Sequence, residues 1–291
     1  MKTAQDNSLN IGVLGDLHGH FCLALTILKR WENENRKRFD LILQVGDFGV
    51  WPYPFHKLDK ATLKFSKKDA DEISFPGYLQ QSEESFAFFD QASPPEKRIS
   101  SQIIFIKGNH EDFEYLDEIE KQENSDLIPV DYYSKFLYLP NGASASIKIR
   151  NKKLTVGGIG GIENGKNGFT KKEINKLMRP NSLDVLLCHE PYLGALNECS
   201  GSDEIRSLVA YAEPSYFFCG HYHIEGQKLS QINQTNSYIL NQVSFRTERE
   251  LSRNCIGILE WSSKSDNRFY FLKDAWLWKY SKENYRHISK S

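Results

Sequence analysis

Five short groups of polar residues, each directly after an apolar run, constrain this chain more than any other feature. In chain order they are Asp16-Leu17-His18, Gly46-Asp47, Gly108-Asn109-His110-Glu111, Cys188-His189-Glu190 and Gly220-His221-Tyr222-His223. Short apolar runs of this kind predict buried strands, so each group is expected where a strand opens into a loop. Oxygen and imidazole donors gathered at strand ends are what two divalent cations require.

Length and composition favour one large globular domain. The chain has 291 residues, of which 40% are hydrophobic and 13% aromatic, as in ordinary globular proteins. We expect residues 1–291 to form a single domain. The longest apolar runs, at 184–188 and 216–219, are far shorter than the roughly 18–20 residues that a membrane span requires. Residues 1–10 are polar and contain no apolar signal region, so we expect a cytoplasmic protein without a membrane partner.

The cysteines and the charge exclude other kinds of site. The five cysteines include no pair with the spacing of a zinc site, so we expect buried, reduced thiols. A net charge of −1 argues against bulk electrostatic capture of nucleic acid. The last segment, 226–291, is more basic, with 11 Lys and Arg against 6 Asp and Glu. It is a candidate contact for a polyanion, and a solvated surface is the alternative.

Hydrophobic periodicity predicts strands interleaved with helices over the first three quarters of the chain. We expect strands at 10–15, 41–45, 103–107, 154–161, 184–188 and 216–219, and helices at 21–32, 82–91 and 203–212. Thr170 and Glu173 have capping-box spacing, which predicts a further helix beginning after Thr170. Segment 52–80, rich in prolines, lysines and aromatics, separates two predicted strands. We interpret it as an insertion at the rim of the site, because long loops in compact domains are usually functional.

The pattern changes after residue 223. Short strands are expected at 239–243, 256–261 and 269–272, without long helices between them, so 226–291 is interpreted as a β-rich meander. Strands alternating with helices first, and hairpins later, favour a layered α/β sandwich over an open doubly wound sheet.

The donor types suit a pair of cations that share one carboxylate. Two ions about 3.5–4 Å apart need a bridging anion, and Asp47 is the candidate bridge, with one oxygen for each ion. Asp16 and His18 are two positions apart on one strand-to-loop turn, so both can face one ion. The other candidates offer an amide oxygen or an imidazole: Asn109, His189, His221 and His223. A mixed nitrogen and oxygen donor set suits Mn, Fe, Zn or Co.

With these motifs the chain resembles the calcineurin-like metallophosphoesterases. The resemblance depends on Gly15-Asp16-Leu17-His18-Gly19, Gly46-Asp47, Gly108-Asn109-His110-Glu111, His189 and Gly220-His221-Tyr222-His223, which span residues 11–223. It implies an α/β fold, a four-layer α-β-β-α sandwich. It also implies two divalent metal ions, with Mn²⁺ expected first. The first ion would be held by Asp16, His18, Asp47 and His223, and the second by Asp47, Asn109, His189 and His221.

The resemblance also implies the reaction, which is hydrolysis of a phosphoester by a hydroxide that bridges the two ions. Asp47 and His110 are then the expected catalytic residues. His110 follows Asn109 and is expected to face the substrate, where it would stabilise the transition state or protonate the leaving oxygen. We interpret Asp112 as the cap of a helix over 113–119, and Glu111 as a former of loop hydrogen bonds.

The substrate stays open among a nucleotide, a nucleic-acid phosphodiester and a small phosphoester. Protein Ser/Thr phosphatases of this superfamily carry G-D-x-x-D-R-G, whose Arg binds phosphate, but the run 46–51 contains no Arg. A phosphoprotein phosphatase is therefore disfavoured. The run 157–162 is similar to a segment of RNA lariat debranching enzymes, so a debranching or nuclease-like phosphodiesterase is the alternative function.

A non-catalytic scaffold with the same fold is a remote alternative, disfavoured because all seven expected ligands and His110 are present. Trp51, Tyr53 and Phe55 are candidates for stacking on a base at the mouth of the site, with packing inside segment 52–80 as the alternative. The sequence does not fix the oligomeric state.

Overall fold

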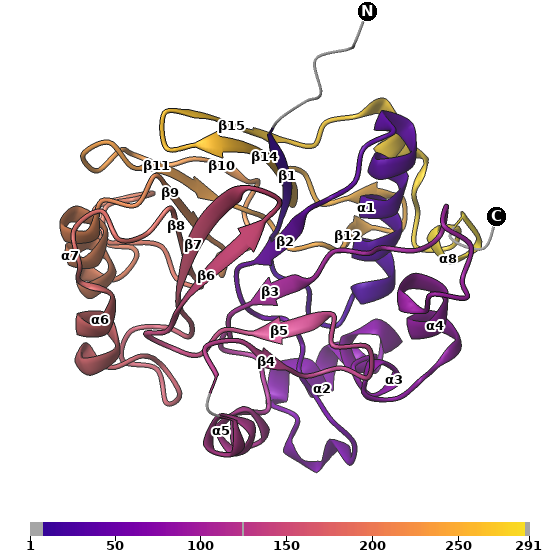
Figure 1. Ribbon diagram of the computed structural model, residues 1–291. Coiled ribbons are helices and arrows are strands. Elements are labelled where there is room, and N and C mark those ends of the chain that lie inside the picture. The colour runs from indigo at the N-terminus through magenta and orange to yellow at the C-terminus, as the bar shows by residue number, and fades with distance from the viewer. Residues whose placement is uncertain (1–7, 124, 289–291) are drawn as a thin grey trace, which may run out of the picture.

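Two β-sheets lie face to face at the centre of the molecule (Figure 1). The computed structural model describes residues 8–123 and 125–288. Within them a seven-stranded sheet has the order β15 (Asp266–Phe271), β14 (Ile256–Ser263), β1 (Leu9–Leu14), β2 (Leu41–Gln44), β3 (Ile103–Phe105), β5 (Phe136–Tyr138), β4 (Ile128–Pro129). A six-stranded sheet has the order β10 (Gln227–Lys228), β11 (Asn236–Ile239), β9 (Tyr216–Cys219), β8 (Val185–Cys188), β7 (Lys152–Ile159), β6 (Ser144–Ile149). A short ribbon pairs β12 (Phe245–Thr247) with β13 (Glu250–Leu251).

Helices cover the outer faces of both sheets (Figure 1). The seven-stranded sheet is covered by α1 (Phe21–Asn35), and the six-stranded sheet by α6 (Lys171–Leu177) and α7 (Asp203–Ala212). The remaining helices are short: η1 (Phe55–Lys57), α2 (Lys60–Ser66), η2 (Ala70–Ile73), α3 (Pro76–Leu79), α4 (Glu83–Phe89), α5 (Phe113–Gln122), η3 (Ala275–Lys279) and α8 (Tyr285–Ile288). The architecture is therefore the four-layer α-β-β-α sandwich that the resemblance implies.

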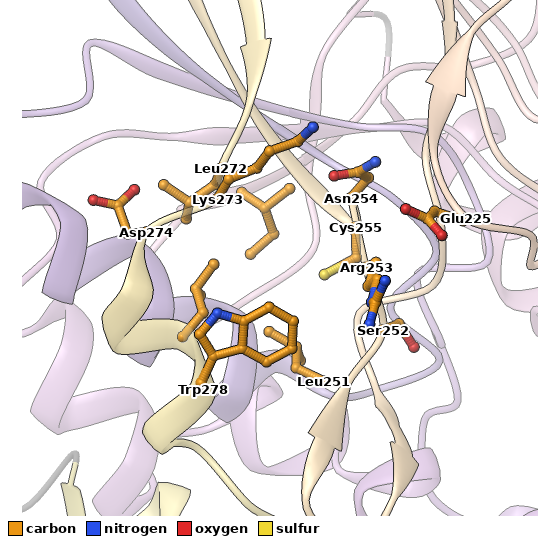
Figure 2. Close-up of a pocket in the computed structure, with 12 residues that line it drawn as sticks. Glu225, Leu251, Ser252, Arg253, Asn254, Cys255, Leu272, Lys273, Asp274 and Trp278 are labelled. Atoms are coloured by element: carbon orange, nitrogen blue, oxygen red, sulfur yellow. The ribbon is translucent and has the colours of Figure 1, made fainter.

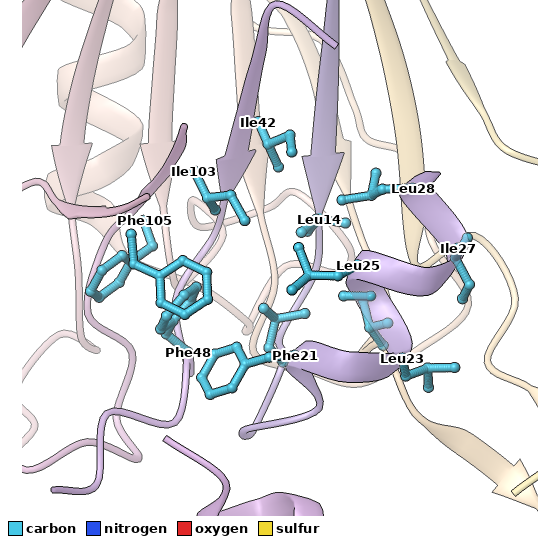
Figure 3. Close-up of a cluster of buried hydrophobic side chains, with 14 of the residues drawn as sticks. Leu14, Phe21, Leu23, Leu25, Ile27, Leu28, Ile42, Phe48, Ile103 and Phe105 are labelled. Carbon is cyan, nitrogen blue, oxygen red and sulfur yellow. The ribbon is translucent and has the colours of Figure 1, made fainter. Parts of the chain in front are cut away.

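Three apolar cores separate the four layers, because side chains alternate along the strands. Ile11 and Val13 of β1 face the core between the two sheets, whereas Leu14, where β1 ends, faces α1. On the helix side Phe21, Leu25 and Leu28 pack against β1, β2 and β3 (Figure 3). The third core lies between the six-stranded sheet and helices α6 and α7.

Most predicted elements are confirmed near their expected bounds. The capping box is present, because Thr170 accepts from the Glu173 N–H while the Glu173 side chain accepts from the Thr170 N–H. Segment 52–80 contains short helices rather than irregular chain. The prediction that residues 239–243 form a strand is wrong, because β11 ends at Ile239.

The predicted meander is also wrong in part. β14 and β15 form the expected antiparallel hairpin, but β11 pairs in parallel with β9 in the other sheet. The segment 226–291 therefore contributes strands to both sheets.

Further sequence expectations concern the cysteines and the membrane. Cys22, Cys188, Cys219 and Cys255 are buried free thiols, while Cys199 is exposed. Among the described residues, no helix has the length and apolar character that crossing a membrane requires. Residues 1–7, part of the polar N-terminal stretch, lie outside the described residues.

Candidate metal centre and substrate cleft

The loops that carry the predicted site residues meet at one edge of the sandwich. β1, β2 and β3 are parallel neighbours in one sheet, and β8 and β9 are parallel neighbours in the other. Each of these strands ends directly before one of the polar groups, so the groups lie at the carboxyl ends of both sheets. In the seven-stranded sheet, the loop after β1 carries Asp16 and His18, the loop after β2 carries Asp47, and the loop after β3 carries Asn109 and His110. In the six-stranded sheet, the loop after β8 carries His189 and the loop after β9 carries His221 and His223.

One group of donors forms around Asp16. The ligand atoms of Asp16, His18, Asp47 and His223 all lie within 4.8 Å of one another. His223 Nε2 is 3.0 Å from Asp16 Oδ2 and 3.2 Å from His18 Nε2. His18 Nε2 is 3.6 Å from Asp47 Oδ2. These are the four residues expected to surround the first ion.

A second group of donors forms on the other side of Asp47. His189 Nε2 lies 3.5 Å from Asp47 Oδ2 and 2.9 Å from Asn109 Oδ1. The rings of His189 and His221 have their centroids 5.0 Å apart. Asp47 therefore lies between the two groups.

The two oxygens of Asp47 have different surroundings. Oδ1 accepts from the backbone N–H groups of Asn109 at 2.7 Å and His110 at 2.8 Å. Oδ2 is the oxygen that faces His18 and His189. From the sequence we expect one oxygen for each ion, whereas this geometry directs a single oxygen, Oδ2, toward both groups. Burial alone would raise the pKa of Asp47, but His189, His18 and the backbone donors outweigh it and hold this pKa well below its usual range.

The donors fit divalent cations because nitrogen and oxygen ligand atoms converge and one buried carboxylate oxygen among them lacks a hydrogen-bond partner in the described residues. His189 Nδ1 is 3.0 Å from the Val45 carbonyl oxygen and donates its proton there. In the tautomer that carries its proton on Nδ1, the Nε2 lone pair of His189 faces the oxygens of Asn109 and Asp47. Asp16 Oδ1 is buried and has no hydrogen-bond partner among the described residues. Such a set is costly when empty and is satisfied by a bound cation.

The charge states of the histidines agree with this fit. Burial lowers the pKa of His18 and of His221 to about 4, so both imidazoles are neutral at pH 7 and can offer a lone pair to a metal. Burial also acts to lower the pKa of His223, but its hydrogen bond with Asp16 outweighs burial and raises that pKa. A cation at Asp16 would take the place of the proton that His223 shares with it.

The local backbone is strained where the donors converge. His18, Asp47, His221 and His223 all have left-handed backbone conformations, with φ of 43°, 48°, 73° and 48°. Non-glycine residues adopt this region rarely, and such strain gathers at functional sites. Gly108 and Gly220 allow the backbone to approach the carboxylates closely. A Cβ on Gly108 would lie 2.0 Å from an oxygen of Asp47, and a Cβ on Gly220 would lie 2.0 Å from an oxygen of Asp16.

Glu111 and Asp112 have the structural roles expected from the sequence. Glu111 is buried and accepts from the backbone N–H groups of Phe48, Gly49 and Val50 at 2.6–3.0 Å. It thereby fixes the loop that follows Asp47. Asp112 caps α5 by accepting from the Tyr115 N–H at 3.1 Å.

His110 has a partner that is not evident from the sequence. Its Nδ1 lies 2.9 Å from Oδ2 of Asp59, which is also the N-cap of α2 and accepts from the Ala61 and Thr62 N–H groups. Burial opposes protonation of His110, but the hydrogen bond to Asp59 and the charge of Asp47 outweigh burial and raise its pKa to about 9. Asp before a helix is a capping signal, yet nothing in the sequence links position 59 to position 110.

A cleft of about 460 Å³ opens in front of the first donor group. His18, His110 and His223 form part of its lining, and segment 52–80 forms another part through α2 and the residues after it. The aromatic residue of that segment in the lining is Phe65. Trp51 is buried in the interior, so its predicted stacking role is wrong. Tyr53 and Phe55 contact each other, with ring centroids 5.4 Å apart, and are not part of this lining.

A separate cavity of about 280 Å³ lies between β13, the start of β14 and η3 (Figure 2). Leu251, Leu272 and Cys255 line it together with the exposed indole of Trp278. None of the eight predicted site residues is in its lining. The cleft of about 460 Å³, which His18, His110 and His223 line, is therefore the candidate substrate site.

Comparison with known families agrees with this geometry. The sequence model of the family described as calcineurin-like phosphoesterase matches residues 9–225. The chain belongs to the calcineurin-like phosphoesterase family. The match extends from β1 to just beyond His223, so it includes every loop of the donor set. Membership supports hydrolysis of phosphoesters and the presence of divalent metals, without naming the substrate or the metal.

Solved structures similar to this chain show low sequence identity. The protein TT1561 of Thermus thermophilus has 13% identity and a TM-score of 0.49, with 91% of this chain and 99% of that chain covered. A novel phosphatase from Mycoplasma pneumoniae has 13% identity and a TM-score of 0.41, with 96% and 99% covered. A search of curated proteins finds no match. The family assignment consequently depends on the family model and not on these neighbours.

Proposed function

We propose that this protein is a phosphodiesterase that uses two divalent cations, with Mn²⁺ as the first expectation. The observation that carries the proposal is the meeting of seven donors from five loops on both sides of Asp47. Asp16, His18, Asp47 and His223 would hold one ion. Asp47, Asn109, His189 and His221 would hold the other.

Two cations at these positions would polarise the phosphoryl oxygens and lower the pKa of a water between them to near neutrality. The protein supplies the fixed geometry for this chemistry. The hydrogen bond from His189 to the Val45 carbonyl orients the imidazole, and the hydrogen bonds from the Asn109 and His110 N–H groups orient Asp47. Ligands held in this way need little reorganisation during the reaction.

His110 would act as the general acid. Its Nδ1–H donates to Asp59, so Nε2 is the nitrogen that remains for the substrate. With a pKa raised to about 9 by Asp59 and Asp47 against the effect of burial, His110 carries a proton at neutral pH. It can donate that proton to the leaving alkoxide oxygen, which typically accelerates such reactions by about 10²–10⁴-fold.

A diester is favoured over a monoester by the sequence around Asp47 and by the size of the cleft. The run that contains Asp47, residues 46–51, has no Arg to neutralise the second charge of a terminal phosphate. The cleft of about 460 Å³ has room for a substituent beyond the phosphoryl group. A nucleotide or a nucleic-acid phosphodiester fits this description, which includes the debranching or nuclease-like alternative. A non-catalytic scaffold fits less well, because the complete donor set is retained.

The purified protein should be assayed with added Mn²⁺ on bis-p-nitrophenyl phosphate and p-nitrophenyl phosphate side by side. We expect metal-dependent cleavage mainly of the diester. Asp47→Asn should lose most activity, because an amide cannot bridge two cations as an anion does. Preference for the monoester would refute the diesterase assignment, and near-normal turnover by Asp47→Asn would refute the site. Absence of cleavage together with absence of bound metal would favour the scaffold.

A further inference from the structure

One face of α2 forms part of the cleft that contains the predicted metal centre. Ala61, Thr62, Phe65 and Lys68 all line the cleft, together with His18, His110 and His223. Ala61, Thr62 and Phe65 lie on one face of α2, and Lys68 is two residues beyond the last residue of the helix, Ser66. Because the N-cap of this helix, Asp59, also holds His110, the same short element faces the substrate and orients the proposed acid.

This face presents an aromatic ring that is only partly covered: Lys64 Nζ lies 5.6 Å from the centroid of the Phe65 ring. Phe65 is half exposed, although it lies beside the donor groups. An accessible ring in a cleft offers a surface on which a flat base can stack, and such stacking does not depend on the base identity.

Two basic side chains in the cleft take part in no ion pair within the part of the chain that the structure describes. Lys68 follows α2, and Arg246 lies on β12; both side chains are exposed, and neither has an ion-pair partner among the described residues. The other lysine of the lining, Lys282, is paired with Asp69 at 2.9 Å. Two unpaired cations in one cleft attract an anion in addition to the phosphate at the metal centre.

The carboxylates in the cleft do not cancel this charge. Asp69 is engaged by Lys282 and lies 3.4 Å from His20 Nε2. Burial raises the pKa of Glu72 to about 7, so this side chain is only partly ionised at neutral pH. Neither of these carboxylates is paired with Lys68 or Arg246 among the described residues.

We propose that the cleft recognises a nucleotide that carries a second phosphate besides the one at the metal centre. The base stacks on Phe65, and the second phosphate contacts Lys68 and Arg246. This inference rests on the proposed phosphodiesterase function and names its substrate class. A nucleic-acid strand and a nucleoside polyphosphate share this chemistry.

Competition against cleavage of bis-p-nitrophenyl phosphate tests the inference. Inhibition constants are measured for two pairs that differ only in phosphates: the thymidine dinucleotides pTpT and TpT, and the nucleotides ATP and AMP. In the wild-type protein the member with more phosphate should inhibit at least fivefold more strongly in one pair. Lys68→Ala and Arg246→Ala should each reduce that preference about threefold to tenfold. For a nucleic-acid strand, each variant should also lower the slope of log affinity against log salt concentration by about 0.7.

Matched variants separate the cleft from charge in general. Lys67→Ala and Arg249→Ala remove neighbouring exposed cations that do not line the cleft, and should leave the preference unchanged. If Lys68→Ala and Arg246→Ala lose the preference for pTpT over TpT, the site binds a nucleic-acid strand. If they lose the preference for ATP over AMP, the site binds a nucleoside polyphosphate. If bis-p-nitrophenyl phosphate is cleaved normally but neither preference exists or responds to Lys68→Ala and Arg246→Ala, the inference is wrong and the proposed function stands. If the wild-type protein cleaves no diester, the proposed function itself is wrong.

Discussion

Four of the residues that converge at the centre hold left-handed backbone conformations, and none of them is glycine. Each costs on the order of 1–3 kcal/mol and persists only when the surroundings impose it. Here Glu111 fixes the loop after Asp47 through three backbone N–H groups, and Asp16 Oδ2 accepts from the His221 N–H at 3.0 Å. The carboxylates thus hold the backbone in place as well as forming part of the donor set. A truncation of Asp47 would disturb both, whereas the isosteric change to Asn mainly removes the charge.

His110 gives the residue-scale prediction. His110→Ala should lower kcat on bis-p-nitrophenyl phosphate by about 10²–10⁴-fold, with KM changed little, because a general acid acts mainly in the transition state. Both metals should remain, since the side chain of His110 is not among the seven donors. Steady-state kinetics and metal analysis on the same preparation measure the two effects. His287→Ala, an exposed histidine on α8, is the control. An unchanged kcat would remove His110 from the mechanism.

At the scale of elements, α2 connects the cleft wall to the chemistry. Asp59 accepts from the Ala61 and Thr62 N–H groups and also holds His110. The segment that carries α2 is anchored to the C-terminal part of the chain, through Lys282 on Asp69 and through Arg286 on Asp71. These two ion pairs thereby hold the short helix α2 beside the candidate metal centre.

The two roles of Asp59 can be separated by substitution. Asp59→Asn keeps a good N-cap but loses the charge on His110, so stability should change by only a few tenths of a kcal/mol. We expect kcat to fall about tenfold, since a charge-assisted hydrogen bond of about 1.5–3 kcal/mol is weakened. Asp59→Ala should show the same loss of rate and also lose about 1 kcal/mol of unfolding free energy. Urea unfolding and kinetics measure the pair. Full activity in Asp59→Asn would mean that Asp59 serves only as the N-cap of α2 and does not assist His110.

At the scale of the whole molecule, the proposed centre joins the two sheets. Asp16, His18, Asp47 and Asn109 follow strands of the seven-stranded sheet, whereas His189, His221 and His223 follow strands of the six-stranded sheet. Bound cations would link both halves of the sandwich and would stabilise only the folded chain.

Metal removal should therefore lower the thermal stability of the protein. At a Mn²⁺ concentration about 100 times the dissociation constant, the linkage gain is about 2.7 kcal/mol, which corresponds to a Tm rise on the order of 5 °C. Thermal unfolding of protein treated with a chelator, before and after Mn²⁺ is restored, measures this rise. In Asp47→Asn the rise should be largely lost. An equal rise in the wild-type protein and the variant would place the stabilising metal elsewhere.

The sequence predicts local structure and the donor loops well because both depend on short patterns. Apolar runs before Asp16, Asp47 and His189 mark strands, and the spacing from Thr170 to Glu173 marks a helix start. Long-range pairing has no such signal: β11 joins β9 in parallel, whereas the same short run is equally suited to a hairpin with β14. The contact between His110 and Asp59 bridges 51 positions and follows from the path of segment 52–80, which no local pattern determines.

The number of divalent ions bound to each chain tests the central claim most directly. Equilibrium dialysis against Mn²⁺, followed by elemental analysis, should give two ions for each wild-type chain and fewer for Asp47→Asn, because the variant loses the shared anionic ligand. One ion or none in the wild-type protein, or two in Asp47→Asn at the same affinity, would contradict a dinuclear centre built around Asp47.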